Sequence, residues 1–128
     1  MPGIEKDQAL QVFEALSSGV RLDVFRLLVQ AGGRGRVAGE ISTALGIPPT
    51  NLSFHLKALV QAGLLGVEQE GRYQRYRANI PLMLDTIAYL TANCCGDHPE
   101  ECADMRDRVP GLAHFLPPLA CSPDGDCK

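Results

Sequence analysis

The chain has 128 residues, of which 45% are hydrophobic, enough for one domain with a modest core. No apolar run approaches the roughly 20 residues that cross a bilayer, and MPGIEKDQAL lacks the basic and apolar regions of a signal peptide, so a cytoplasmic protein is expected. The net charge of −3 argues weakly against nucleic-acid binding, but residues 94–128 hold seven acids and three bases, which leaves +1 on residues 1–93.

Two helices are predicted at the start of the chain. The first spans residues 5–16 and is amphipathic, with a wide apolar stripe. The second spans about Val20–Gln30 and is almost wholly apolar, so we expect it to lie at the centre of the core. The stretch AGGRGR at residues 31–36 predicts a flexible, solvated turn, and phosphate contact is an alternative role for its two arginines.

The stretch from Val37 to Leu65 predicts a helix-turn-helix. The turn is Gly46-Ile47-Pro48-Pro49, because glycine accepts left-handed backbone angles and proline removes an N–H donor. The second helix is expected over Thr50–Ala62, capped by Thr50 or Asn51 and ended by Gly63 in the C′ position. We interpret this second helix as a recognition helix.

The predicted recognition helix has an apolar side and a polar side. Its buried stripe is expected to contain Leu52, His55 or Leu56, Leu59 and Val60. The remaining face carries short polar groups, one aromatic ring and one cation, which suit a DNA major groove better than a core. The residues expected to read DNA are Thr50, Asn51, Ser53, Phe54 and Lys57, although Phe54 has the alternative of turning inward.

A β-hairpin is predicted directly after the recognition helix. Its strands are Leu65–Gln69 and Tyr73–Ala78, joined by the turn Glu70-Gly71-Arg72. Three arginines beside a reading helix fit contact with phosphate or the minor groove, whereas an ordinary solvated hairpin is the alternative. We therefore predict a wing in which Arg72, Arg75 and Arg77 hold the DNA backbone.

A closing helix is predicted at about Pro81–Asn93. It is apolar on too many sides for a lone surface helix, so together with the N-terminal helix it is expected to form a homodimer seam. These elements predict a mainly α fold with a β-hairpin wing, a winged helix-turn-helix. Residues 1–93 are expected to be its DNA-binding and dimerisation domain, and residues 94–128 a cysteine-containing acidic C-terminal extension.

The order of these elements resembles the ArsR/SmtB family of winged-helix metalloregulators over roughly residues 8–93. The likeness is carried by ALSSGVRLDVFRLL, SFHLKALVQAGLL and EGRYQRYR. It implies a homodimer that represses its own operon and leaves DNA when an inducer ion binds. It also places His55 beneath the recognition helix, for packing or a phosphate hydrogen bond rather than metal binding.

The chain departs from the family's usual inducer sites. Residues 40–44, in the first helix of the helix-turn-helix, lack the cysteine pair of arsenic repressors. Asp85 has no histidine partner on the closing helix, where zinc sensors carry a histidine and carboxylate set. An inducer site must therefore lie elsewhere, or be absent.

Five cysteines in a chain of this kind indicate metal binding or redox chemistry rather than a disulfide framework. Cys94, Cys95 and Cys102 follow the closing helix, and soft thiolates suit a soft ion such as As(III) or Sb(III). The arrangement resembles a subset of arsenic repressors that use three such cysteines. Alternatives are a Zn or Cd site that adds His98, a disulfide switch, or structural burial. Cys121 and Cys127 form a possible second site, reach the first site of a partner subunit, or are incidental.

The sequence therefore predicts a metalloid-responsive repressor whose apo dimer binds operator DNA and is released by As(III) or Sb(III). A rival from another class is a thiol-based metal-buffering or redox protein that keeps a winged-helix scaffold for protein contact. Neither reading is enzymatic, since the sequence holds no nucleophile–base pairing and no phosphate loop.

Overall fold

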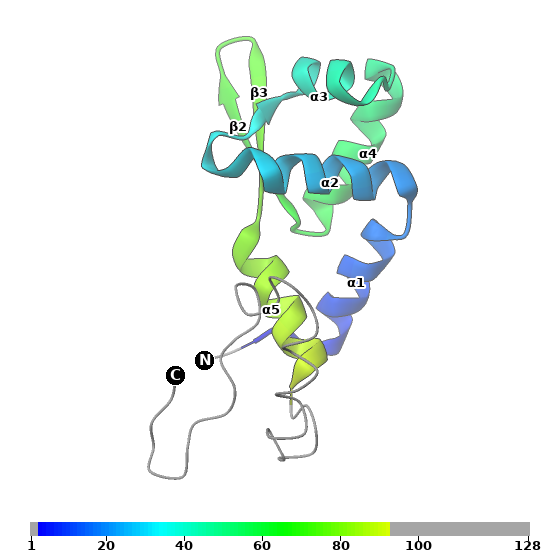
Figure 1. Cartoon of the computed structure of the whole chain (residues 1–128), viewed down its shortest axis with the longest axis vertical. Helices are drawn as coiled ribbons and strands as arrows, with labels where there is room; N and C mark the ends of the chain where they lie inside the picture. Colours follow the sequence, from blue (N-terminus) through cyan, green and yellow to red (C-terminus); the bar gives the residue numbers. More distant parts are fainter. Residues whose placement is uncertain (1–2, 93–128) are drawn as a thin grey trace, which may run out of the picture. The chain divides into compact units, whose positions relative to one another are not determined.

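The computed structural model describes residues 3–92, and its elements are labelled in Figure 1. Ile4–Met83 form one compact unit, whereas the described residues from Leu84 to Ala92 belong to a second. The mainly helical fold with an antiparallel hairpin agrees with the prediction. In chain order the elements are α1 (Lys6–Leu16), α2 (Gly19–Ala31), η1 (Gly32–Arg34), β1 (Arg36–Val37), α3 (Ala38–Leu45), α4 (Pro49–Gln61), β2 (Leu65–Glu70), β3 (Tyr73–Ala78) and α5 (Ile80–Thr91).

Helix α2 is the centre of the first unit, as its apolar sequence predicts. It contacts α1, α3, α4 and β3, and its buried residues are Val24, Phe25 and Leu28. Ser18 caps its start by accepting a hydrogen bond from the backbone N–H of Arg21. The Arg21 side chain donates in turn to the carbonyl of Ala15, 2.6 Å away, and so fixes the end of α1 against the start of α2.

Helices α3 and α4 form the predicted helix-turn-helix. Gly46 takes the left-handed conformation with φ of 65°, and Ser42 binds Ile47 through both its carbonyl and its hydroxyl. The predicted cap was wrong: Pro48 occupies the N-cap position and Pro49 the first helical position, so α4 begins one residue earlier than Thr50. Proline suits that position because its missing N–H has no intrahelical acceptor there.

The end of α4 is held by Gly63, as predicted. Gly63 has φ of 83°, and the N–H groups of Gly63 and Leu64 donate to the carbonyls of Val60 and Leu59. This pair of bonds is a Schellman motif. Asn79 then links this turn to α5, because its amide donates to the carbonyl of Gly63 and its side-chain oxygen accepts from the N–H of Leu82.

The hairpin is part of a three-stranded sheet with the order β1-β3-β2. The stretch 31–36 was predicted to be a flexible turn, but it forms η1 and the start of β1, where Arg36 pairs with Tyr76. Gly35 makes this approach possible: a Cβ atom there would lie 2.2 Å from the carbonyl oxygen of Tyr76. Only glycine fits so close to β3. A strand of two residues such as β1 is too short to show a periodic strand pattern in the sequence.

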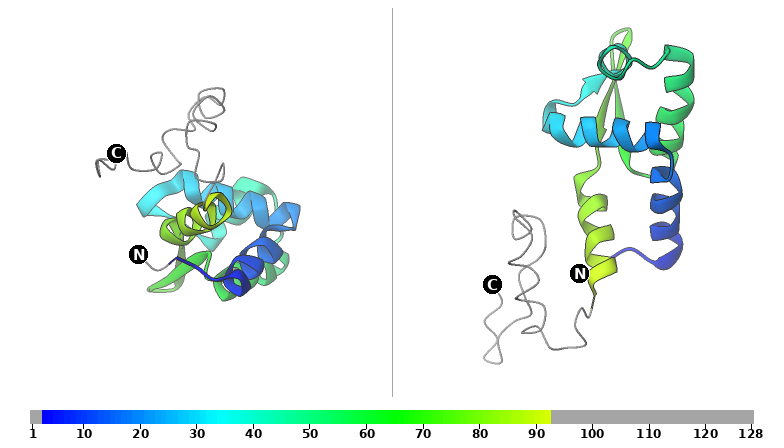
Figure 2. Two further views of the ribbon diagram at one scale, coloured as in Figure 1. Left: turned by 90° about the horizontal axis from the view of Figure 1, so that it is seen from below. Right: turned by 45° about the vertical axis from the view of Figure 1, so that its right-hand side comes forward.

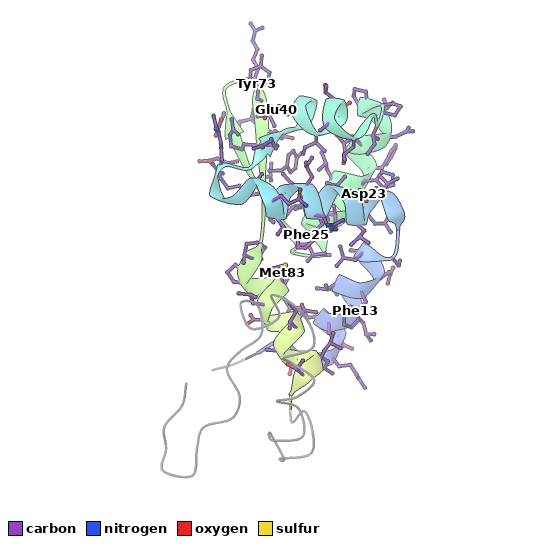
Figure 3. The ribbon with its side chains drawn as sticks, viewed as in Figure 1. Phe13, Asp23, Phe25, Glu40, Tyr73 and Met83 are labelled. Carbon is purple, nitrogen blue, oxygen red and sulfur yellow. The ribbon has the colours of Figure 1, made fainter. Side chains whose placement is uncertain are left out.

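The tip of the hairpin and α3 lie on one side of α2, and α1 lies on the other (Figure 1). The right-hand view of Figure 2 looks nearly along α3 and shows α4 standing to one side of the hairpin. Figure 3 shows Tyr73 at the hairpin tip and Glu40 at the start of α3, both on that same side of α2. No helix among residues 3–92 is long and apolar enough to cross a membrane.

Candidate nucleic-acid interface

Helix α4 presents most of the predicted reading residues to solvent. Its buried stripe is Leu52, Leu56 and Leu59, which confirms Leu56 rather than His55 as the core residue. His55 is half-buried. The side chain of Phe54 is 75% exposed, so it does not turn inward. Exposed around it are Thr50, Asn51, Ser53 and Lys57.

The wing arginines occupy two different settings. Arg72 is exposed in the two-residue turn between Glu70 and Tyr73, and no described residue forms an ion pair with it. Arg75 and Arg77, by contrast, are partly buried by the wing itself. Whether all three contact phosphate stays a prediction, but Arg72 is the one of the three whose charge has no internal partner among residues 3–92.

Two ion pairs and two backbone contacts tie the other arginines to the protein. Arg75 donates to the carboxylate of Glu70 at 2.9 Å and to the carbonyl of Arg34 at 3.0 Å. Arg77 donates to the carboxylate of Glu68 at 2.7 Å and to the carbonyl of Gly33 at 2.7 Å. These bonds join β2, β3 and η1, so Arg75 and Arg77 set the position of the wing whatever else they contact. Each guanidinium still has further N–H groups beyond those bonds.

A half-open groove of about 410 Å³ is lined by residues of α3, α4 and the wing. Its lining is mainly apolar. Val67, which pairs with Tyr76 across the hairpin, lines it from β2 and is 46% exposed. Lys57 is the one charged side chain among the described residues that line it. The lining residues are Ala38, Gly39, Ser42, Pro49, Leu52, Ser53, Leu56, Lys57, Val60, Val67, Gln74 and Tyr76.

Gln74 is a groove residue that sequence reasoning missed. The hydroxyl of Tyr76 donates to its side-chain oxygen at 3.0 Å, which leaves the amide N–H groups of Gln74 as donors. Burial raises the pKa of Tyr76 above its ordinary value, so the phenol keeps the proton that it donates. The alternation of β3 put Gln74 and Tyr76 on one face, but nothing in the sequence placed α4 opposite that face.

The predicted metal ligands Cys94, Cys95 and Cys102, the secondary pair Cys121 and Cys127, and His98 all lie outside the described residues. Between residues 3 and 92, no group of three or more His, Cys, Asp or Glu side chains is arranged to hold a metal ion. The inducer site and the boundary between residues 93 and 94 therefore stay predictions from the sequence.

The chain is similar to proteins that are described as regulators of transcription. A family described as a helix-turn-helix domain matches residues 16–68, which run from the end of α1 into β2. A probable mercury resistance operon repressor of Streptomyces lividans is 25% identical over 111 residues, 87% of this chain and 85% of that protein. The HTH-type transcriptional regulator YceK of Bacillus subtilis (strain 168) is 36% identical over 84 residues, 60% of this chain and 83% of that protein.

A solved structure gives the same fold. It is the homodimeric winged helix-turn-helix DNA-binding domain of a possible ArsR-family transcriptional regulator from Mycobacterium bovis, which is 31% identical. The match has a TM-score of 0.55 and covers 77% of this chain and 95% of that one.

Proposed function

Because the chain belongs to the ArsR family of winged-helix transcriptional regulators, we propose that it is a metalloid-responsive repressor of its own promoter. The single observation that carries the proposal is the pairing of an exposed reading helix with a trio of cysteines just after α5. Neither feature alone would distinguish a sensor from an unregulated DNA-binding protein.

The DNA contacts follow from exposure. The exposed face of α4 enters the major groove, where side chains can distinguish base pairs by their donors, acceptors and methyl groups. Thr50, Asn51 and Phe54 lie on that face, and the phenyl ring of Phe54 suits a thymine methyl. Arg72 at the wing tip adds a phosphate or minor-groove contact, and Arg75 and Arg77 hold the wing beside it.

The protein acts as a homodimer in this proposal, so that two α4 helices meet successive major grooves. Large apolar side chains are exposed on α1 at Leu10 and Phe13, and on α5 at Leu84, Tyr89 and Leu90. Exposed apolar side chains on two helices are the kind of surface that a second copy covers. The homodimeric state of the Mycobacterium bovis domain supports the same arrangement.

The inducer is a soft, thiophilic ion, and As(III) or Sb(III) fits the three thiols best. Cys94, Cys95 and Cys102 would supply three thiolates within one subunit, next to the predicted dimer helix. Binding of the ion there would make the DNA-binding arrangement of the dimer less stable relative to an arrangement that does not bind DNA. A coupling free energy of about 1–3 kcal/mol is enough for a 5- to 150-fold loss of DNA affinity.

Mercury is a second candidate inducer. The relative from Streptomyces lividans, which aligns with 87% of this chain, is described as a probable mercury resistance operon repressor. Hg(II) is as thiophilic as As(III) and needs fewer thiolates, so it is a competing ligand for the same cysteines. A third candidate is Zn or Cd, in a site that adds His98 to the cysteines.

The test is fluorescence anisotropy of the full chain on a labelled fragment of its own promoter, titrated separately with arsenite, antimonite, Hg(II), Zn(II) and Cd(II). We expect release by arsenite or antimonite, and no release from the variants Cys94→Ser, Cys95→Ser and Cys102→Ser. Release by Hg(II) alone would favour the second candidate, and release by zinc or cadmium would favour the site with His98. Release of all three cysteine variants by arsenite would refute the thiol site.

The same titration addresses the rival from another class. A metal-buffering or redox protein on this scaffold would bind ions without preferring its own promoter fragment over an unrelated duplex. Metal affinity that is unaffected by added DNA, together with equal affinity for both duplexes, would therefore replace the repressor proposal.

A further inference from the structure

The groove beside α4 and the wing is lined by residues of two kinds. Three of them carry hydrogen-bond donors: the ammonium of Lys57 and the hydroxyl of Ser53 on α4, and the amide of Gln74 on β3. Others are apolar, and Leu56 and Val67 are among them. Such a lining matches a ligand that has both an anionic group and an apolar part.

No described residue neutralises the charge of Lys57 in the groove. Lys57 and Ser53 are exposed, and neither forms an ion pair or a side-chain hydrogen bond among residues 3–92. No Asp or Glu is found among the described lining residues. The wing arginines Arg75 and Arg77, in contrast, have carboxylate partners on β2. Lys57 is therefore a cation held beside an acid-free groove.

The position of the groove identifies the ligand, and this step rests on the proposed function. If α4 lies in a major groove and the hairpin tip reaches the neighbouring minor groove, the strand of DNA that separates the two grooves must pass between them. This groove is lined by α4 on one side and by the hairpin on another, and α3 contributes the rest of its lining. We propose that it holds one sugar–phosphate segment, with Lys57, Ser53 and Gln74 at the phosphate and Val67 against the deoxyribose.

In this proposal the exposed surface of α4 has two parts, one that contacts the DNA backbone and one that contacts the bases. Consecutive residues of a helix are about 100° apart, so Phe54 points a quarter turn away from Ser53, and Asn51 points further still. Neither Phe54 nor Asn51 lines the groove, whereas Ser53 and Lys57 do. Ser53 and Lys57 therefore position the protein on the DNA backbone, while Phe54 and Asn51 meet base edges. From the sequence alone, Asn51, Ser53 and Lys57 were expected to read bases, and Phe54 either to contact DNA or to turn inward.

The experiment compares Lys57→Gln with two controls in the full chain, on the promoter fragment and on an unrelated duplex, at several salt concentrations. For Lys57→Gln we expect the same fold-loss of affinity on both duplexes and a salt slope shallower by about 0.9, the value for one lost phosphate contact. Lys6→Gln, the same change on α1, should alter neither quantity. Phe54→Ala should lower affinity for the promoter more than for the unrelated duplex and leave the slope unchanged.

A second measurement locates the phosphate. Single methylphosphonates, which remove the charge of one phosphate, are placed along the promoter fragment. At one position the substitution should weaken wild-type binding but have no further effect on Lys57→Gln.

Three outcomes would overturn the proposal. An unchanged slope with altered base preference would make Lys57 a base reader. If the methylphosphonate weakens binding of Lys57→Gln as much as binding of the wild type at every position, Lys57 contacts none of these phosphates. If Lys57→Gln binds DNA with wild-type affinity, Lys57 is not part of the interface. Because the slope is measured on an unrelated duplex too, failure to recognise the promoter would refute the proposed function separately.

Discussion

The base and the tip of the wing use the same residue type in different ways. At the base, Arg75 and Arg77 bind carboxylates on β2 and carbonyls of η1, and β1 pairs with β3. At the tip, Arg72 is exposed without an ion-pair partner among residues 3–92, and Tyr73 is 64% exposed. A cation with internal partners joins neighbouring elements of the protein, whereas one without them has its charge available for an outside partner, which we propose to be DNA.

The largest effect is expected from Gly35→Ala at the base. Gly35 has φ of 61°, and a Cβ atom would lie 2.2 Å from the carbonyl oxygen of Tyr76, so β1 must separate from β3. The free energy of unfolding should fall by about 3 kcal/mol or more, measured by urea denaturation. Gly71→Ala at the tip is the matched control, since φ is 60° there and nothing lies within 4 Å. It should cost only about 1–2 kcal/mol, and equal losses would show that base and tip do not differ.

Arg77→Gln should have an intermediate effect. It removes a hydrogen bond to Gly33 and an ion pair with Glu68, but the Arg77 side chain is 38% exposed, so solvent weakens both. We expect unfolding free energy to fall by about 1 kcal/mol, and amide hydrogen exchange in β1 to accelerate.

Arg72→Gln is the counterpart at the tip. It should change the free energy of unfolding by no more than about 0.5 kcal/mol, because Arg72 makes no ion pair in the described part of the chain. Its effect should appear instead as a DNA-binding salt slope shallower by about 0.9. A stability loss in Arg72→Gln as large as in Arg77→Gln would contradict the distinction between base and tip.

The smallest effect is a pH dependence from Tyr76. Its pKa in the folded protein is raised by burial, so above pH about 10 the unfolded chain loses the proton while the folded chain keeps it. The stability that comes from the neutral phenol is complete below that pH and is lost as pH rises further. Tyr76→Phe should lack this alkaline loss, although it sacrifices the hydrogen bond to Gln74 at neutral pH. If the free energy of unfolding changes in parallel for the wild type and Tyr76→Phe between about pH 8 and about pH 11, the alkaline loss does not come from Tyr76.

Hydrophobic spacing was sufficient to predict the helices and the hairpin. The apolar stripe of α4 and Gly63 at its end are local signals, and both were confirmed. The strand β1 was missed because it has only two residues, and its partner Tyr76 lies 40 positions further along the chain. The α4 cap was wrong because the rule for Ser, Thr, Asn and Asp outweighed the equally local preference of proline for the first helical position.

The exposed face of α4 was predictable from the sequence, but the contacts that surround it were not. Residue types on α4 indicated a reading face, and the structure resolved the choice for Phe54 by exposing it. The ion pairs of Arg75 and Arg77, and the groove beside Lys57, depend on which elements meet in space. Such contacts leave no periodic signal in one sequence.

The most direct test of the central proposal compares the full chain with a chain that ends at residue 93, by anisotropy on the labelled promoter fragment with and without arsenite. Circular dichroism establishes that both chains are folded. We expect similar affinity for DNA without arsenite, and release by arsenite of the full chain only. A folded, shortened chain that still leaves DNA on addition of arsenite would contradict the proposal that the cysteines after α5 sense the ion.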